Sequence, residues 1–493
     1  MMTSCASLSS RRGKRVIFIA LFLFSCLLLY YFAPHIKERA LIVTSQGCAT
    51  FIKKPQDQPP LEPPMISPDR FPTVFPDRPK YDPTTVTKET RLAAIAVHGF
   101  TTMDQLYLRN GTFYIVTSNQ YGCPLLENII PHITISPETS QFLEDVNTHP
   151  ANEIRLITPQ QAAYILGDRV MGIEGLSVIL YDTTMMTHYY HWWGEIILGF
   201  WRAYSVLDLP KTSSLYWPSR FIIPFYQGNK WRDRADIDGP LMKSAFPSAT
   251  IESRDYWNDL LKLDITIVFQ RAMIISRHVT QKHPNSKIWP KMIAGLMGLD
   301  VHERFWESLR VVLVRNLVGS LPEIDEVGKI ISLEHETTIR PAITYISRQN
   351  GGRRLTNDSH DSLVEALAKL EEEGVCDVRV AVMENMTLNE QVRLSATSTI
   401  TIGVHGNGLT HQLWMPSSRR STVIEIVYPG STDFDYWMLS QNVGHKHYLV
   451  WNDTIKTINP HDKVKILDGF HDNAIPVHGE AVANLIRSLL RET

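Results

Sequence analysis

The second half of the chain alternates segments of strand and helix character, and this alternation limits the fold more than any other feature of the sequence. Apolar segments rich in β-branched residues indicate strands, whereas apolar residues recurring at helical spacing indicate helices. Strands are predicted at 341–348, 377–383, 399–404, 422–427 and 447–450, and helices at 361–374, 387–397, 407–415 and 434–442. Such an alternation predicts an α/β fold, in which a parallel sheet carries helices on both faces.

The first half of the chain has a less regular pattern. Strands are predicted at 176–181, 220–226 and 264–270, and a long amphipathic helix rich in aromatic residues is predicted at 190–207. A chain of 493 residues is too long for one ordinary core. We therefore predict an N-terminal α/β lobe at 91–330, a C-terminal Rossmann-type lobe at 331–475, and a last helix within 476–493.

An uncharged apolar segment near the N-terminus, 16–33, reads VIFIALFLFSCLLLYYFA. As a helix it would span about 27 Å, enough for the core of a bilayer. Three arginines and one lysine precede it, which favours a cytoplasmic tail at 1–15 and a lumenal remainder. We predict an uncleaved signal anchor at 16–33 and a proline-rich stem at 34–90; a cleaved signal peptide is the alternative.

Acceptor sequons for N-glycosylation support a lumenal position. Their asparagines are Asn110, Asn357, Asn385 and Asn452. Together with the anchor they predict a single-pass type II protein of the Golgi or endoplasmic reticulum membrane. The net charge of −2 gives no support for binding nucleic acid, and the cysteines show no zinc-site spacing.

Two segments of the C-terminal half place phosphate-binding chemistry at the ends of predicted strands. The segment 401–410, TIGVHGNGLT, leads from a strand through a glycine-rich turn into a helix, where free backbone N–H groups suit a diphosphate. Arg348, Arg353 and Arg354 follow another strand, and guanidinium groups match phosphate oxygens. The alternatives are an ordinary tight turn and solvated surface arginines.

Carboxylates and a histidine in apolar surroundings form two further candidates. His191 and Glu195 are four residues apart on a predicted helix, so they share one face, and either could act as a general base. Glu425 lies inside an apolar strand, where a carboxylate is costly unless it is paired. Glu425 could bind ribose hydroxyls or form a structural salt bridge, and the helix pair could be a surface contact only.

Taken in order, these motifs resemble those of glycosyltransferase family 61, which includes plant β-1,2-xylosyltransferases and the EGF-domain O-GlcNAc transferase. The resemblance spans about residues 185–455 and is strongest to fungal members. The matching residues are His191, Glu195, Ser347, Arg348, Arg354, His405, Gly406, Leu409, Thr410 and Glu425. One departure is His188, which stands where the family often has asparagine.

The resemblance implies a GT-B fold, with two Rossmann-like lobes facing a cleft, the acceptor on the N-terminal lobe and the donor on the C-terminal lobe. It implies inverting transfer of a sugar, xylose or N-acetylglucosamine, from a UDP-sugar to a glycan or glycoprotein. Glu195 is then the favoured base, with His191 as the other candidate. The implied donor-binding residues are Ser347, Arg348, Arg354, His405, Gly406, Gly408, Leu409, Thr410 and Glu425.

Two Asp-x-Asp triplets leave a metal-dependent alternative, because such triplets can hold a divalent ion on a donor diphosphate. They are Asp433 with Asp435, and Asp236 with Asp238. We expect no metal and no other cofactor, since arginines and helix amides can hold the diphosphate instead. The competing class of function is a catalytically inactive protein that binds carbohydrate or nucleotide on a transferase fold.

Overall fold

The computed structural model describes residues 88–92, 97–131, 153–182, 186–208, 217–325, 330–332, 340–472 and 474–491. All of them belong to one compact unit, Pro79–Thr493. The expected tail and anchor, and nearly all of the expected stem, lie outside the described residues. Within the described ranges, no helix has the length and apolar character needed to cross a bilayer.

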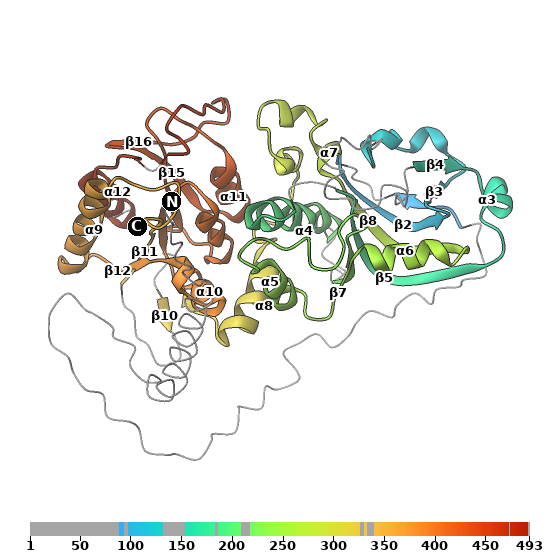
Figure 1. The fold of residues 1–493 in the computed structure, drawn as a ribbon, viewed down its shortest axis with the longest axis horizontal. Helices are drawn as coiled ribbons and strands as arrows, with labels where there is room; N and C mark the ends of the chain where they lie inside the picture. Colours follow the sequence, from blue (N-terminus) through green and yellow to red (C-terminus); the bar gives the residue numbers. More distant parts are fainter. Residues whose placement is uncertain are drawn as a thin grey trace, which may run out of the picture. The chain divides into compact units, whose positions relative to one another are not determined.

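The C-terminal sheet has the predicted parallel α/β pattern (Figure 1). Its strands, in spatial order, are β12 (Asp377–Ala381), β11 (Ala342–Ile346), β13 (Ile400–Val404), β14 (Thr422–Ile426), β15 (Lys446–Trp451) and β16 (Thr454–Lys456). The first five are parallel, and β16 pairs antiparallel with β15. The direction of strand addition reverses between β11 and β13, and parallel α/β sheets bind ligands at the carboxyl ends of strands beside such a reversal.

Helices cover both faces of this sheet, as predicted. They are α9 (Asn357–Glu372), α10 (Leu388–Ala396), η10 (Asn407–Trp414), α11 (Asp435–Val443) and α12 (Gly479–Arg491). Helices α9 and α12 share one apolar cluster with the strands, whereas α10, η10 and α11 belong to another. Helix α10 begins with the capping box that the sequence predicts, formed by Thr387 and Glu390.

The N-terminal sheet is mixed rather than parallel, which differs from the expected Rossmann-like lobe. Its strands run in the order β4 (Glu153–Ile157), β3 (Thr112–Val116), β2 (Phe100–Arg109), β8 (Thr266–Ile275), β5 (Val170–Leu180), β6 (Pro218–Ile222) and β7 (Thr250–Glu252), with β1 (Arg91–Leu92) beside β2. Strand β2 is antiparallel to both β3 and β8, and Asn110 and Gly111 join it to β3 in a two-residue hairpin. Both turn residues have positive φ, as such a turn requires.

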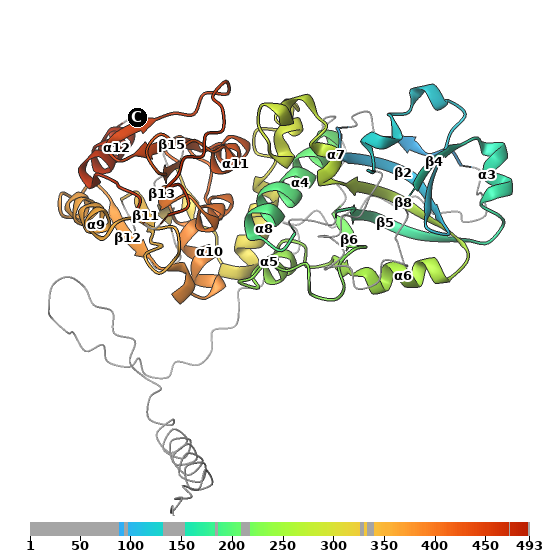
Figure 2. The same cartoon turned by 45° about the horizontal axis from the view of Figure 1, so that its top comes forward.

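A long helical segment lies between the two sheets in Figures 1 and 2. It consists of the π-helix η5 (Tyr190–Ile197), α4 (Leu198–Ser205) and the short η6 (Val206–Asp208). The predicted helix therefore exists, but it is not amphipathic over its first half, because every residue from Trp192 to Trp201 is buried. Its aromatic side chains join one apolar core that includes residues from both sheets.

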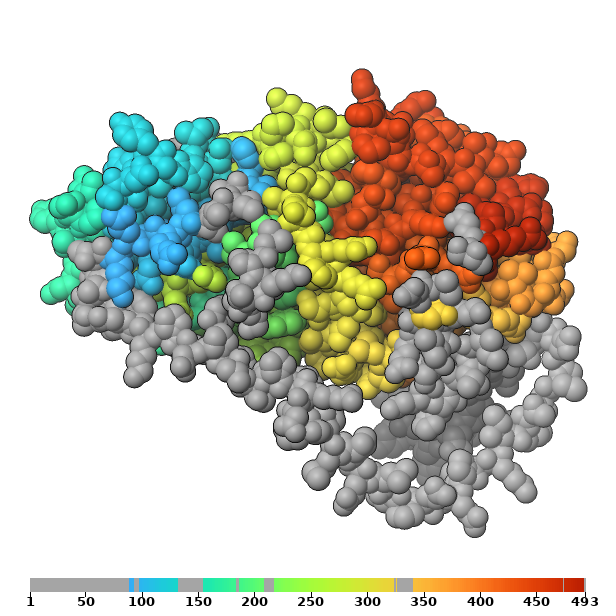
Figure 3. Space-filling view, turned by 180° about the vertical axis from the view of Figure 1, so that it is seen from behind, coloured from blue at the N-terminus to red at the C-terminus, as the bar shows by residue number. Residues whose placement is uncertain are grey.

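Shorter elements complete the N-terminal half and connect it to the C-terminal sheet. They are η3 (Gln120–Gly122), η4 (Leu126–Asn128), α3 (Pro159–Ile165), α5 (Asp238–Ala245), α6 (Arg254–Lys262), α7 (Arg277–Thr280), η7 (Pro284–Lys287), η8 (Met292–Leu296), α8 (Glu307–Val318), β9 (Glu323–Ile324), β10 (Ile330–Ser332) and, within the C-terminal half, η9 (Met383–Asn385). Helix α8 packs against α5 and α10, and Figure 3 shows this yellow segment meeting the orange C-terminal half.

Candidate functional site

The carboxyl ends of β11 and β13 bring the predicted phosphate-binding motifs together. Arg348 follows β11, and His405 follows β13. The Nη1 atom of Arg348 donates to the backbone carbonyl of His405 at 2.7 Å, and Arg353 donates to the same oxygen at 2.8 Å. Two guanidinium groups thus meet at the point where the strand order reverses, which is where an anionic ligand is expected in such a sheet.

Gly406 is required for this arrangement. Its φ angle is +152°, a conformation that other residues rarely adopt. A Cβ atom at this position would lie 1.4 Å from Nη1 of Arg348, so no larger residue fits unless the guanidinium moves. The glycine therefore allows Arg348 to pack against the turn. This role differs from contacting a bound phosphate with the glycine backbone itself.

Arg353 is the second arginine of the pair, whereas Arg354 was the one implied by the family resemblance. The Nη1 atom of Arg354 donates to the carbonyl of Gly351 in its own loop, at 3.1 Å. Arg353 also hydrogen-bonds to the ring of His471 and lies 4.8 Å from the centre of the Phe470 ring. No sequence pattern connects Phe470 or His471 to the loop that carries Arg353.

Most of the remaining residues of the glycine-rich turn are buried, and so is Ser347. Leu409 and Thr410 are buried, and the Thr410 hydroxyl has no hydrogen-bond partner among the described residues. The Leu409 amide already donates to the Gly406 carbonyl at 2.9 Å, and a Cβ on Gly408 would come within 2.9 Å of Ile346. Ser347 is also buried. These residues support the turn and do not present side chains to a ligand.

Glu425 lies in β14 behind this turn, and it is fully buried. Its Oε1 is 2.5 Å from Nδ1 of His405, and its Oε2 is 2.8 Å from Nε2 of His447. Burial raises the pKa of Glu425, but the two histidines outweigh burial and lower it to about 2. With both oxygens in use, Glu425 fits the structural alternative and not the binding of ribose.

His191 and Glu195 pair on η5 as the spacing predicts, with 2.5 Å between Nδ1 and Oε2. Glu195 is almost completely buried, and it also accepts from Nη1 of Arg277 at 2.6 Å and from the Met292 amide at 2.9 Å. Burial raises the pKa of Glu195, but the Arg277 guanidinium and the His191 ring together hold it well below its ordinary value. A carboxylate stabilised in this way is a poor proton acceptor.

The imidazole of His191 is more accessible than its partner. Its side chain is 24% exposed, compared with 2% for Glu195. Within the described ranges, its second nitrogen, Nε2, makes no hydrogen bond. π-Helical turns are rare and often occur at functional sites, and this pair lies in one. Glu195 therefore orients His191, and the imidazole is the better placed of the two to exchange a proton.

The first Asp-x-Asp triplet lies beside His405. One ligand atom each from His405, Asp433 and Asp435 falls within 4.8 Å of the others. Lys291 lies among them, with its Nζ 2.9 Å from Asp433 and also paired with Asp435. Lys291 has no sequence signal, because it comes from a loop before η8 and more than a hundred residues before the aspartates.

The second triplet does not converge. Asp236 is on the surface and pairs with Arg232 at 3.0 Å. Asp238 is completely buried, and neither of its carboxylate oxygens has a hydrogen-bond partner within the part of the chain that the structure describes. Burial and the neighbouring Asp233 raise the pKa of Asp238 well above its ordinary value.

Contacts between the two halves place these clusters in one site. The Met292 amide bonds to Glu195, and the adjacent residue, Lys291, reaches the aspartates. The Tyr190 amide donates to the Asn407 side chain at 3.2 Å, next to the glycine-rich turn. The predicted base pair and the predicted donor turn therefore lie side by side, although they are far apart in sequence.

All of the predicted glycosylation asparagines are exposed. Asn110 is in the β2–β3 turn, Asn357 begins α9, Asn385 ends η9, and Asn452 lies between β15 and β16. Each of these asparagines therefore meets the requirement of exposure for N-glycosylation.

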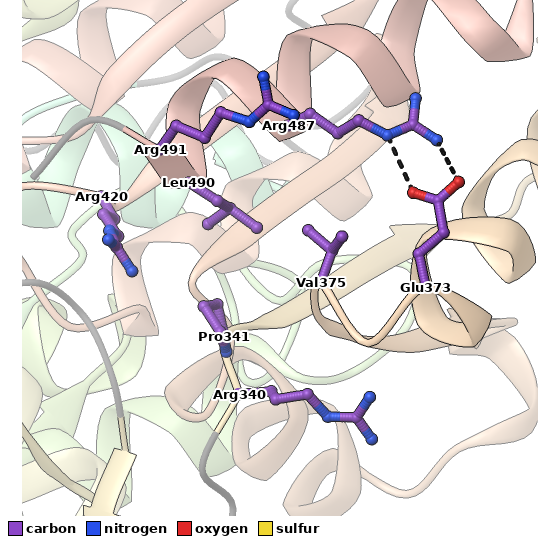
Figure 4. A pocket seen from close by; sticks show the side chains of 8 residues that line it. All are labelled: Arg340, Pro341, Glu373, Val375, Arg420, Arg487, Leu490 and Arg491. Atoms are coloured by element: carbon purple, nitrogen blue, oxygen red, sulfur yellow. Dashed lines mark hydrogen bonds and ion pairs between the residues drawn. The ribbon is translucent and has the colours of Figure 1, made fainter.

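A cavity of about 400 Å³ lies at the opposite, amino-terminal edge of the C-terminal sheet (Figure 4). Its lining residues are Arg340, Pro341, Glu373, Val375, Arg420, Arg487, Leu490 and Arg491. Arg487 holds Glu373 through two hydrogen bonds, of 3.1 and 3.0 Å. None of the predicted site residues lines it, so this cavity is separate from the candidate site.

Comparison with known proteins connects this geometry to a family. The family model described as Glycosyltransferase 61 matches residues 189–424. A stretch of 75 residues is 36% identical to the EGF domain-specific O-linked N-acetylglucosamine transferase of Drosophila melanogaster. That stretch covers 15% of this chain and only 14% of the relative. The matched residues include His191, Glu195, Arg348 and His405 and end one residue before Glu425, and they confirm the resemblance drawn from these motifs: residues 189–424 are similar to the Glycosyltransferase 61 family.

Proposed function

We propose that this protein is an inverting glycosyltransferase that moves a sugar from a UDP-sugar to a hydroxyl group of a glycan or glycoprotein. The observation that carries the proposal is the meeting of Arg348 and Arg353 at the strand-order reversal, where Tyr190, the residue before His191, bonds to Asn407 of the adjoining turn. The family match supports the class of reaction. The name of the Drosophila relative supports N-acetylglucosamine as the transferred sugar, and xylose is the other candidate.

The proposed architecture is of the GT-B type, with the donor on the C-terminal sheet and the acceptor on the N-terminal side. The parallel C-terminal sheet supports this arrangement, since its strand-end crevice carries the arginines. The mixed N-terminal sheet is a departure from a pair of Rossmann-like lobes. We further propose that 16–33 anchors the protein in the Golgi or endoplasmic reticulum membrane, with the catalytic part in the lumen.

In the proposed reaction, Arg348 and Arg353 neutralise the diphosphate of the donor. His191 Nε2 takes the proton of the acceptor hydroxyl, while the Nδ1 side of the ring hydrogen-bonds to Glu195, which stabilises the imidazolium. The acceptor oxygen then bonds to the anomeric carbon from the face opposite the diphosphate. The bond from that carbon to the β-phosphate oxygen breaks, its electron pair stays on the oxygen, and UDP leaves with inversion at the carbon.

Binding of UDP and hydrolysis of UDP-sugars test the proposal on the full-length protein in detergent. Arg348→Ala removes charge-assisted hydrogen bonds worth about 1.5–3 kcal/mol, so we expect UDP to bind about 10- to 150-fold more weakly by calorimetry. Arg354→Ala is the matched control and should have a smaller effect, because Arg354 bonds within its own loop. Unchanged affinity in folded Arg348→Ala would place the diphosphate elsewhere.

A screen of UDP-sugars separates an enzyme from an inactive binding protein. An enzyme should slowly hydrolyse one UDP-sugar in the absence of acceptor, and UDP-N-acetylglucosamine and UDP-xylose are the first donors to try. Tight UDP binding without hydrolysis or transfer of any donor would favour the inactive alternative.

A further inference from the structure

His405, Asp433 and Asp435 form a cluster with the donor atoms of a divalent-cation site. One nitrogen and two carboxylate oxygens lie within 4.8 Å of one another, and such mixed sets suit ions like Mn²⁺. The aspartate side chains are only 13% and 18% exposed, so two negative charges are held close together and largely out of water. Such an arrangement is unfavourable unless a cation lies between the carboxylates.

Lys291 supplies that cation. Its ammonium nitrogen is 2.9 Å from Asp433 Oδ1 and pairs with Asp435 as well. The ammonium group therefore lies in the space where a metal ion would contact the same oxygens.

The position of Lys291 is fixed by its neighbours. Its own amide donates to the Trp289 carbonyl at 2.7 Å, and the next amide, of Met292, donates to the buried Glu195. These two hydrogen bonds hold the backbone on either side of Lys291. A divalent ion at the same carboxylates would be repelled by the ammonium a few ångströms away.

We propose that the cluster of His405, Asp433 and Asp435 is a latent divalent-metal site, which Lys291 occupies as a built-in cation. Lys291 keeps metal ions out of the wild-type protein, and replacing it with an uncharged residue opens the site to Mn²⁺. The role of Lys291 in the reaction rests on the proposed function. Next to the arginines, Lys291 supplies the positive charge that a metal ion supplies in metal-dependent transferases.

Titration of the full-length protein in detergent with Mn²⁺, followed by electron paramagnetic resonance, tests the proposal. Wild type should show no Mn²⁺ binding that is lost when Asp435 is replaced by asparagine. Lys291→Met, which keeps much of the side-chain length, should gain one bound Mn²⁺ per chain, and Lys291→Met with Asp435→Asn should lose it again. Thermal melting checks that each variant folds, and Lys291→Gln serves as a second neutral replacement.

Two results would overturn the proposal. One is a Mn²⁺ ion bound to wild type that Asp435→Asn abolishes, since Lys291 would then not exclude metal. The other is the absence of new Mn²⁺ binding in folded Lys291→Met or Lys291→Gln. These measurements need no turnover, so they stand even if no UDP-sugar is a substrate. Where hydrolysis is detected, wild-type turnover should resist EDTA, and that of Lys291→Met should rise with Mn²⁺.

Discussion

At the scale of single residues, the site depends on which member of the His191–Glu195 pair exchanges the proton. The ring of His191 is partly exposed, and its Nε2 makes no hydrogen bond to a described residue, so we expect His191→Ala to reduce kcat about 10²–10⁴-fold. UDP affinity should stay near the wild-type value, because the arginines belong to the other cluster. Parallel measurements of turnover and of UDP binding by calorimetry check this. Near-normal turnover in His191→Ala would assign the base elsewhere.

Glu195→Gln is expected to affect stability as well as activity. Its carboxylate is the buried partner of Arg277, and removing one member of a buried ion pair costs about 3–5 kcal/mol. Chemical denaturation should show this loss, and kcat should also fall because the His191 imidazolium loses its stabilising charge. If Glu195→Gln unfolds at the wild-type denaturant concentration, the ion pair with Arg277 contributes little.

The His191–Glu195 pair could be predicted from the sequence, but its roles could not. Helical spacing brings the two side chains together, and it says nothing about Arg277, which comes from α7, 82 residues later. The family resemblance favoured Glu195 as the base, whereas the contacts of Glu195 with Arg277 and Met292 favour His191. Lys291 was missed as a site residue for the same reason, and Arg353 was a candidate that the family resemblance did not include.

At the scale of elements, the turn between β13 and η10 is the feature to test. Gly406→Ala places a methyl group on the Arg348 guanidinium, so Arg348 must leave the His405 carbonyl. We expect UDP affinity to fall by about the same 10- to 150-fold as in Arg348→Ala. Gly352→Ala is the matched control, because its methyl group would meet no atom within 4 Å. Calorimetry on both variants measures the difference.

Equal UDP affinities in the two glycine variants would contradict this role for the turn. The same measurement also separates the close approach at Gly406 from a general effect of adding a methyl group to a glycine-rich loop.

Local patterns predicted the elements of the C-terminal sheet well, because each one contains its own signal. The apolar strands, the capping box at Thr387 and the glycine after α9 act over a few residues. In the N-terminal sheet, the Asn110–Gly111 pair was taken only as a sequon and not as a hairpin turn, so the antiparallel pairing of β2 was missed.

At the scale of the whole molecule, buried neutral histidines make stability depend on pH. Burial lowers the pKa of His411 to about 4; burial and then the Arg310 charge lower that of His445 to about 3. The unfolded chain therefore binds protons below the ordinary value of 6.5, where the folded protein does not. Each histidine should remove about 1.4 kcal/mol of stability per pH unit as the pH falls through this window.

Thermal melting at pH 7 and pH 5 measures this effect, with His411→Gln as the comparison. The variant should lose less stability between the two pH values than wild type does. Parallel losses in both proteins would mean that His411 does not contribute to the acid sensitivity.

The apolar core that includes residues from both sheets predicts a single unfolding transition. Trp414 ends η10 in the C-terminal half, yet its indole donates to the Tyr189 hydroxyl at 2.9 Å and packs on Trp193 from η5. Trp414→Ala should cost about 3–5 kcal/mol. Calorimetry should show one shifted peak and not two. Separate transitions for the two halves would mean that this core does not couple them.

The same core limits how substrates can enter. A rigid-body rotation that opened the site would expose Trp193, Trp414 and their neighbours, at about 1.5–3 kcal/mol for each large side chain. We therefore expect the radius of gyration to change little when UDP binds. Access would instead depend on surface segments such as the one that carries His471, and the timing of product release would reflect the motion of that loop and not a hinge between lobes.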